Sequence, residues 1–264
     1  MPTKAVADER QRAVDIHSQQ AGLFADRYDG RSANPYSDCF VYSRHRLNAY
    51  LSRYLPLRGD GCSLLDVGCG TGHWMRALAD RGFIVSGVDA SAAMLEHARE
   101  LNPDATIEQG DVDRLPFPDR TFDYVICIEV LRYLRDPASA IREIARVLKP
   151  DGTALVTAAP RLNLNGYWLV NQVTRRVPIG NLTQLRQYFT TSGTLVRQFR
   201  SAGLADVIVH GVYVGPLNWV ERLAKSRLDP FLRWWEPIDR ALSDRPVLRD
   251  VANMYLARAV RPAK

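Results

Sequence analysis

Apolar and polar positions alternate with two different periods along residues 63–158. Short apolar runs rich in Val, Ile and Leu are separated by stretches with a helical period, which is the pattern of a parallel sheet covered by helices on both faces. The pattern predicts strands over residues 63–67, 83–88, 106–109, 122–128, 153–158, 206–214 and 253–260. It predicts helices over residues 73–80, 91–101, 137–148 and 194–202. The sequence therefore predicts an α/β protein.

Several predicted boundaries have a chemical cause. Ser91 suits a helix N-cap, because its hydroxyl can accept a hydrogen bond from a free backbone N–H. Asp136 and Pro137 read as a cap followed by proline at the first helical position. Residues 149–152, Lys-Pro-Asp-Gly, should stop a helix and turn the chain.

Three segments lie outside the alternation, namely residues 1–56, 160–192 and 215–250. Loops that leave the carboxyl ends of parallel strands emerge at one edge of the sheet, where ligands bind. Segments 160–192 and 215–250 follow the fifth and sixth strands, so both should open over that edge. Residues 215–250 interleave apolar side chains with Arg and Lys at helical spacing. We expect one or two amphipathic helices there, which either dock on the sheet or meet a membrane surface.

Composition narrows the class of protein. The chain has 264 residues, of which 46% are apolar and 24% charged, so it can bury a core without disulfides or metals. Its four cysteines form no CxxC pair, and no metal site is expected. The charged N-terminus does not resemble a signal peptide, and no apolar run is long enough to span a membrane, so a cytoplasmic protein is expected.

The charge of the chain is unevenly distributed. The formal net charge is +6, and residues 152–205 contain several arginines but no Asp or Glu. A block of one sign is either a solvated face or a site for an anionic partner, such as a substrate carboxylate or phosphate, an acidic lipid surface or nucleic acid. No nucleic-acid-binding module accompanies the arginines, so we expect no nucleic acid partner.

The most specific feature is a glycine turn. Residues 64–72 read Leu-Leu-Asp-Val-Gly-Cys-Gly-Thr-Gly, an apolar strand that runs into a tight turn and then a helix. Glycines let the backbone turn sharply and let a ligand lie against it. A nicotinamide-binding loop would need a glycine where His73 stands, and a P-loop would need a Gly-Lys pair that the chain lacks.

Acidic residues follow neighbouring strands. Asp89 closes the second strand about twenty residues after the loop, where a carboxylate in a doubly wound fold accepts hydrogen bonds from a ribose diol. Asp111 ends the third strand, where it could accept from an adenine amino group. Together with Asp66 these acids favour a positively charged adenosine ligand without phosphates.

Four features of the sequence together resemble the class I S-adenosylmethionine-dependent methyltransferases. They are the glycine turn, the Asp that closes the second strand, the segment Gly110-Asp111-Val112-Asp113-Arg114-Leu115-Pro116-Phe117 and residues 148–152. The resemblance covers residues 63–158 and implies a Rossmann-like, doubly wound, seven-stranded sheet whose last strand is antiparallel. It also implies an N-terminal helical lid over residues 1–56 and a methyltransferase domain over residues 57–264, with acceptor-site insertions at 160–192 and 215–250.

The resemblance also implies a cofactor site. Asp66 and the loop glycines would line the methionine portion of S-adenosylmethionine, Asp89 the ribose, and Asp111 with Val112 the adenine. Cys127 would offer its backbone beside the sulfonium, and Tyr28 would cover the cofactor from the lid. The full set of implied cofactor residues is Tyr28, Asp66, Gly68, Gly70, Gly72, Asp89, Ala90, Met94, Asp111, Val112 and Cys127.

The sequence departs from the family after the fourth strand. Many relatives carry a His where this chain has Arg132, so a common general-base candidate is missing. Glu129, Arg132 and Tyr133 are the predicted catalytic or acceptor-contacting residues. Of the five histidines, His17 and His45 lie in the lid region and are the better placed.

Two functions follow from this pattern. The first is methyl transfer by in-line displacement to a small-molecule or lipid-like, anionic acceptor, with peripheral membrane contact if the acceptor is a lipid. The second is a cofactor-binding partner or regulatory subunit without catalysis. The predicted acceptor-binding residues are Arg161, Arg175, Arg176 and Trp219.

Overall fold

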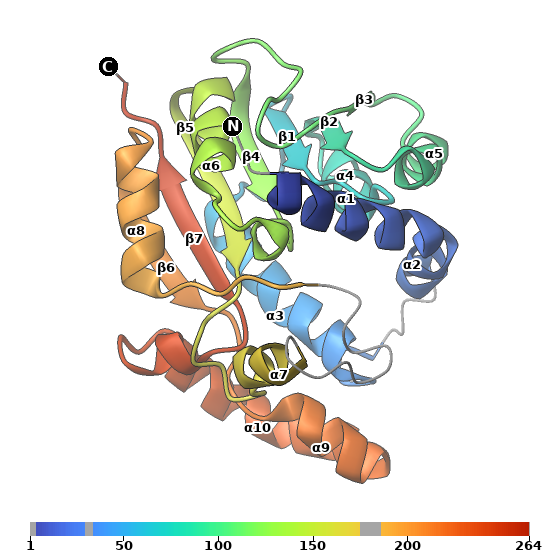
Figure 1. The fold of residues 1–264 in the computed structure, drawn as a ribbon, viewed down its shortest axis with the longest axis vertical. Helices are drawn as coiled ribbons and strands as arrows, with labels where there is room; N and C mark the ends of the chain where they lie inside the picture. Colours follow the sequence, from blue (N-terminus) through green and yellow to red (C-terminus); the bar gives the residue numbers. More distant parts are fainter. Residues whose placement is uncertain (1–3, 30–33, 175–185, 264) are drawn as a thin grey trace.

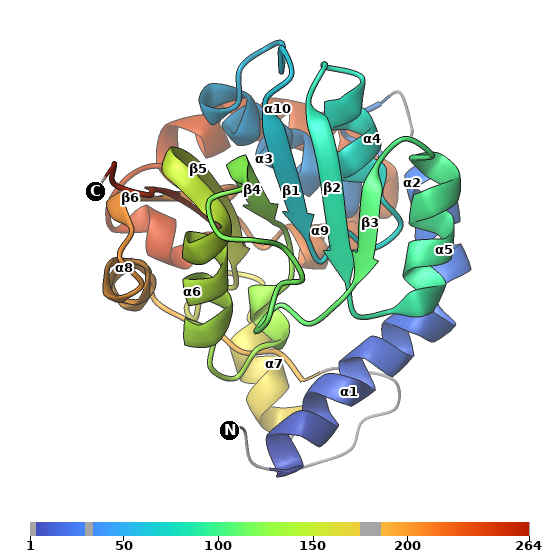
Figure 2. The same cartoon turned by 90° about the horizontal axis from the view of Figure 1, so that it is seen from above.

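The computed structural model describes residues 4–29, 34–174 and 186–263. Its strands form one seven-stranded sheet in the order β3-β2-β1-β4-β5-β7-β6 (Figures 1 and 2). The strands are β1 Ser63–Val67, β2 Ile84–Asp89, β3 Thr106–Gln109, β4 Phe122–Cys127, β5 Leu148–Ala158, β6 Ala205–Gly211 and β7 Tyr255–Val260. Neighbours among β1 to β5 run parallel, and β7 is antiparallel to both β5 and β6. The predicted sheet with its antiparallel last strand is confirmed.

Helices cover both faces of this sheet. They are α1 Lys4–Gln19, α2 Ala21–Asp29, α3 Cys39–Tyr54, α4 His73–Ala79, α5 Ala92–Leu101, α6 Ala138–Val147, α7 Tyr167–Thr174, α8 Ser192–Ser201, α9 Leu217–Ala224 and α10 Leu228–Ser243. Short 3-10 turns occur at Leu131–Tyr133, Lys225–Arg227 and Leu248–Val251. No helix in the described part of the chain is long and apolar enough to cross a membrane.

The core divides along the pleat of the strands. Because successive strand residues point to opposite faces, Leu64 packs with α3, α4 and α5, whereas Leu65 packs with α6 and α8. Both leucines are fully buried. This burial on both faces explains why the strands of the parallel part read as continuous apolar runs.

The predicted helix boundaries are mostly right. Ser91 caps α5, and its hydroxyl accepts from the N–H of Met94. The predicted cap at Asp136 is one residue too early, because Pro137 is the N-cap of α6 and Ala138 its first residue; the Asp136 carboxylate still accepts from the N–H of Ala138. The predicted turn at residues 149–152 was wrong in one respect, because β5 already begins at Leu148. The register against β4 shifts there, and Asp151 takes a positive φ of 62°.

The segment after β6 forms the two expected amphipathic helices. Leu217 of α9 and Leu228 and Leu232 of α10 are buried against the α3 face of the sheet, so the apolar side of this segment docks on the protein. Leu223 on α9 and Trp234 on α10 remain exposed.

The N-terminal helix α1 lies across one edge of the sheet. Figure 2 shows β1, β2 and β3 pointing with their carboxyl ends toward α1. The glycine turn and the end of β2 both occur at this edge, so α1 covers the place where the sequence predicts a ligand.

Candidate cofactor and acceptor site

The glycine turn after β1 requires its glycines for close packing. Gly68 has a φ of 74°, and a Cβ there would approach Cγ2 of Val130 to 2.2 Å. Gly72 has a φ of 81°, and a Cβ would meet the side-chain nitrogen of Asn102 at 2.5 Å. Any other residue at these positions would combine an unfavourable backbone conformation with a clash. The packing of this turn against its neighbours therefore requires glycine at both positions.

Asp89 at the end of β2 is fixed by backbone donors. Its two carboxylate oxygens accept from the N–H of Gly70 and the N–H of Ser91, each at 2.9 Å. Burial raises the pKa of Asp89 above its ordinary value, while these N–H groups oppose the shift. Each oxygen keeps a further lone pair, so the carboxylate can accept hydrogen bonds from a ligand diol.

Asp66, near the end of β1, is more deeply buried than Asp89. Its side chain is 1% exposed, and its Oδ2 has no hydrogen-bond partner among the described residues. Burial and the neighbouring charge of Asp89 raise the pKa of Asp66 to about 7. A buried acid with an unsatisfied oxygen is stabilised by a positive charge placed nearby.

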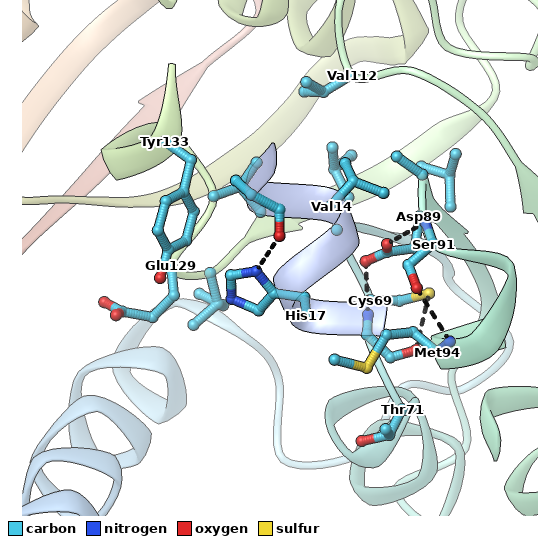
Figure 3. A pocket seen from close by; sticks show the side chains of 18 of the residues that line it. Val14, His17, Cys69, Thr71, Asp89, Ser91, Met94, Val112, Glu129 and Tyr133 are labelled. Carbon is cyan, nitrogen blue, oxygen red and sulfur yellow. Dashed lines mark hydrogen bonds between the residues drawn. The ribbon is translucent and has the colours of Figure 1, made fainter. Parts of the chain in front are cut away.

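A cavity of about 270 Å³ opens above the turn, and we call it the glycine-loop cavity. Its floor is the glycine turn, with Asp89 on one wall and Glu129 and Tyr133 on another, and residues of α1 and α2 close it from above (Figure 3). The lining residues from α1 and α2 are Arg10, Ala13, Val14, His17 and Phe24.

Polar contacts hold α1 over this cavity. Arg10 forms ion pairs with Asp111 and Asp113, which follow β3. The hydroxyl of Ser18 is 2.7 Å from the hydroxyl of Ser91 at the start of α5. The Glu9 carboxylate pairs with Arg186 and accepts from Tyr188. These contacts join α1 to three separate parts of the chain.

The cavity collects many of the residues implied by the family resemblance. Lining it are Gly68, Gly70, Asp89, Ala90, Met94 and Val112. Asp66, Gly72 and Cys127 are outside the lining, next to residues that belong to it. Tyr28 belongs to α2, but its side chain lies outside the part of the structure that is described.

Asp111, which was expected to contact adenine, does not line the glycine-loop cavity. Its side chain is 54% exposed, pairs with Arg10 and accepts from the N–H of Asp113. Its neighbours Gly110 and Val112 line the cavity instead. Asp111 thus holds α1 in this structure, and a direct contact with a ligand stays a prediction.

A second cavity of about 270 Å³ adjoins the first, and we call it the adjoining cavity. The two share Phe40, Arg44, Ile128 and Glu129 as lining residues. The rest of its lining comes from α3, α7, α9 and the strand ends: Cys39, Ser43, Leu47, Arg132, Tyr167, Tyr213, Asn218, Glu221, Asn253 and Met254. Both segments expected at the ligand edge therefore contribute to it, through Tyr167 and through Asn218 and Glu221.

Glu129 forms the boundary between the cavities. It has a positive φ of 65°, a strained conformation for a residue with a side chain, and its N–H donates to the hydroxyl of Thr157 at 2.6 Å. Its carboxylate pairs with Arg132, which also donates to Gln187 at 3.0 Å. Burial lowers the pKa of Arg132, but the charge of Glu129 and nearby tyrosines raise it by more, so Arg132 stays charged.

Two of the four predicted acceptor-binding residues, Arg161 and Trp219, lie in the described part of the chain. The guanidinium of Arg161 lies 5.1 Å from the ring centre of Trp168, and Trp219 donates to the carbonyl of Asn165 at 3.2 Å. Neither lines the two cavities. Arg175 and Arg176 lie outside the described residues.

Sequence reasoning expected a helical lid over residues 1–56 but, apart from His17, did not single out the side chains of α1 and α3 that line the cavities. Arg10, Phe40 and Arg44 approach the glycine turn only in three dimensions, and no local motif marks them. It also missed that two histidines pair with carboxylates, His45 with Glu236 and His210 with Asp244. Those partners lie far along the chain, so spacing could not reveal them.

Comparison with known proteins agrees with this geometry. A family model described as a methyltransferase domain matches residues 65–156. The chain is 31% identical over 215 residues to a ubiquinone biosynthesis O-methyltransferase of Alkalilimnicola ehrlichii, covering 77% of this chain and 85% of that protein.

Solved structures share the fold. The [4+2]-cyclase SpnF matches with a TM-score of 0.63 at 23% identity, over 97% of each chain. Phosphoethanolamine N-methyltransferase 2 of Haemonchus contortus, in complex with S-adenosyl-L-methionine, matches with a TM-score of 0.58 at 22% identity, over 83% of this chain and 52% of that one. Because one of these structures is a cyclase, the fold alone does not define the reaction.

The chain belongs to the class I S-adenosylmethionine-dependent methyltransferases, and it is an enzyme that uses S-adenosylmethionine. The residues present fit this group: bare backbone at Gly68, an anchored carboxylate at Asp89 and an unsatisfied buried acid at Asp66 suit a ribose-bearing cation.

Proposed function

We propose that the protein transfers a methyl group from S-adenosylmethionine to a hydroxyl oxygen of a small polar molecule bound in the adjoining cavity. The observation that carries the proposal is the shared wall of the two cavities at Ile128 and Glu129. With the cofactor in the glycine-loop cavity, an acceptor in the adjoining cavity would reach it across this wall. The name of the O-methyltransferase relative supports oxygen as the accepting atom.

The residues of the site would act mainly by alignment. When bound, S-adenosylmethionine supplies a methyl group that is already activated by a positive sulfur. The chain then has to hold the acceptor in line and to exclude water, which together account for much of the rate in such displacements. We infer that Asp89 orients the cofactor, that α1 closes the site, and that the Glu129–Arg132 pair fixes the acceptor side.

The lining of the adjoining cavity favours a polar acceptor with hydrogen-bonding groups. Ser43, Asn218 and Asn253 offer neutral donors and acceptors, and Glu221 accepts from the N–H of Cys39. Arg132 is already paired with Glu129, so the cavity is not a site of excess positive charge. We infer that an anionic group on the acceptor is not required for binding.

A lipid-like acceptor is the second candidate. Trp219, Leu223 and Trp234 are 47%, 84% and 63% exposed on the helices that follow β6. Arg222 lies next to Trp219, with its guanidinium 5.7 Å from the ring centre. Exposed Trp and Leu beside Arg are the composition of helices that rest on a membrane surface.

The test is transfer of labelled methyl groups. Purified protein is incubated with methyl-labelled S-adenosylmethionine and cell extract, and label is counted in aqueous, organic and macromolecular fractions. We expect label in the aqueous fraction for a small polar acceptor and in the organic fraction for a lipid-like one. S-adenosylhomocysteine should form in equal amount.

Two variants locate the reaction. Asp89→Ala should abolish both cofactor binding and transfer, because the ribose loses its acceptor. Asn218→Leu keeps nearly the same side-chain shape but removes the hydrogen-bonding amide from the adjoining cavity, so it should lower transfer while calorimetry still detects S-adenosylhomocysteine binding. Unchanged transfer by Asn218→Leu would contradict the proposed acceptor site, and cofactor binding without label in any fraction would favour a non-catalytic subunit.

A further inference from the structure

His17 on α1 has a defined tautomer. Its Nδ1 lies 2.7 Å from the carbonyl oxygen of Ala13, one turn earlier in the helix. A carbonyl oxygen can only accept a hydrogen bond, so Nδ1 carries the hydrogen. In the neutral ring Nε2 is then left with a lone pair and acts as an acceptor. Among the described residues nothing donates to Nε2.

The ring of His17 is held in place by aromatic neighbours. It stacks on Phe24, with ring centres 5.6 Å apart, and meets the edge of Tyr133 at 5.0 Å. All three residues line the glycine-loop cavity. In Figure 3 the second nitrogen of His17 faces the side of the cavity where Glu129 lies. His17 thus presents a lone pair to the glycine-loop cavity, on the side where Glu129 lies.

Several other polar groups that line the glycine-loop cavity are already engaged. The Glu129 carboxylate is neutralised by Arg132, and the Asp89 carboxylate is held by two backbone N–H groups. His73, the other imidazole of the lining, bonds to Thr71 at 3.0 Å and is 5% exposed. Thr71 lies across the cavity from Tyr133 in Figure 3. At the position after β4 where relatives often carry His, this chain has Arg132.

We propose that Nε2 of His17 accepts the proton of the acceptor hydroxyl during methyl transfer, so that the N-terminal helix supplies the general base. The acceptor oxygen forms a bond to the methyl carbon, and the carbon–sulfur bond breaks with its electron pair remaining on sulfur. The hydroxyl proton moves to Nε2, and the resulting imidazolium later returns it to solvent. This inference rests on the proposed function.

The base would be in place only while α1 is closed. Arg10 and Ser18, which flank His17 along α1, bind the turn after β3 and the start of α5. The same movement of α1 would then cover the cofactor and bring His17 to the acceptor. An acceptor proton could not be removed before the site is covered.

The first test separates a base from a cofactor ligand. His17→Phe keeps the ring between Phe24 and Tyr133 but lacks the nitrogens. We expect the rate of label transfer at saturating S-adenosylmethionine to fall by about 10²–10⁴-fold, which is the usual contribution of a general base to the rate. S-adenosylhomocysteine affinity should stay within about threefold, since the cofactor contacts remain. His97→Asn, a histidine change on α5 outside both cavity linings, is the matched control and should leave both unchanged.

Chemical rescue by imidazole distinguishes a proton-accepting role of His17 from a packing role. In His17→Ala, added imidazole should restore part of the label transfer, which a purely structural role would not allow. The proposal is overturned if His17→Phe loses cofactor affinity but keeps turnover at saturation, or if it keeps full turnover.

A second measurement needs no acceptor. Nitrogen-15 spectra of histidine-labelled protein, with the His17 signal assigned by its loss in His17→Phe, should show Nδ1 protonated and Nε2 unprotonated at pH 8. The opposite tautomer would overturn the proposal. If wild-type protein transfers no label to any fraction, the proposed function fails, and the spectrum still decides whether Nε2 can act as a base.

Discussion

Asp66 shows how a buried residue can sense the charge of a ligand. It is enclosed beneath the glycine turn, and the combination of burial and the nearby Asp89 raises its pKa to about 7. S-adenosylmethionine carries positive charge on sulfur and on its amino group. We expect this charge to favour the carboxylate form of Asp66, which would couple binding to loss of a proton.

The coupling predicts a pH dependence with a definite sign. Below pH 7 Asp66 is protonated in the free protein, and binding must release that proton. The Kd of S-adenosylmethionine should therefore rise as pH falls from 8 to 6, by at most about tenfold per pH unit for one proton. Calorimetry in two buffers of different ionisation enthalpy measures the proton released. Asp66→Asn should flatten the dependence, and equal Kd values at both pH values in the wild type would contradict the coupling.

At the scale of single residues, the sequence predicts the position of a side chain when that residue directly follows a predicted strand. The glycines and Asp89 follow their strands directly, so order along the chain was enough to place them. Asp111 also follows its strand, yet its side chain turns to Arg10, which is 101 positions away in the sequence. No local pattern announces such a partner. His17, in contrast, was expected near the site because it lies in the predicted lid, although its contacts with Phe24 and Tyr133 were not expected.

At the scale of elements, α10 is joined to α3 by a buried ion pair. Nε of Arg46 lies 2.9 Å from Asp239, and the two side chains are 3% and 0% exposed. Asp239 also accepts from the hydroxyl of Tyr42 and the N–H of Val214, each at 2.7 Å. Burial raises the pKa of Asp239, opposed by the charge of Arg46. The pair fixes α3, which lines the adjoining cavity, against α10.

Breaking this pair should be costly. Asp239→Ala leaves the buried Arg46 charge with only its longer contact to Glu236, at 3.9 Å, and we expect the free energy of unfolding to fall by about 3–5 kcal/mol. Urea denaturation measures the change. Asp229→Ala removes an exposed carboxylate from the same helix, where it pairs with Arg233, and should change the stability little. Equal effects of the two substitutions would show that the buried pair has no special role.

The elements themselves were largely predictable, because periodicity and caps act over a few residues. The start of β5 was not, since pairing of Leu148 with Phe122 extends a strand into a sequence that favours a turn. The amphipathic pattern of residues 215–250 predicted helices correctly. It could not tell that Leu228 and Leu232 face the sheet while Leu223 and Trp234 face outward.

At the scale of the molecule, the parallel sheet gathers the site at one edge. The glycine turn, the ends of β2 and β4 and both later segments meet there because the carboxyl ends of β1 to β6 point the same way, opposite to that of β7 (Figure 2). The division of that edge into two cavities depends on α1 and α3, whose positions the sequence pattern did not give. The cofactor half was therefore predictable from motifs, and the acceptor half was not.

A crystal structure of the protein with S-adenosylhomocysteine would test this arrangement most directly. We expect the ribose hydroxyls against the Asp89 carboxylate, the sulfur facing Ile128 and Glu129, and α1 closed over the ligand with the adjoining cavity left free. A ligand bound in the adjoining cavity, or an adenosine placed away from Asp89, would contradict the two-cavity account.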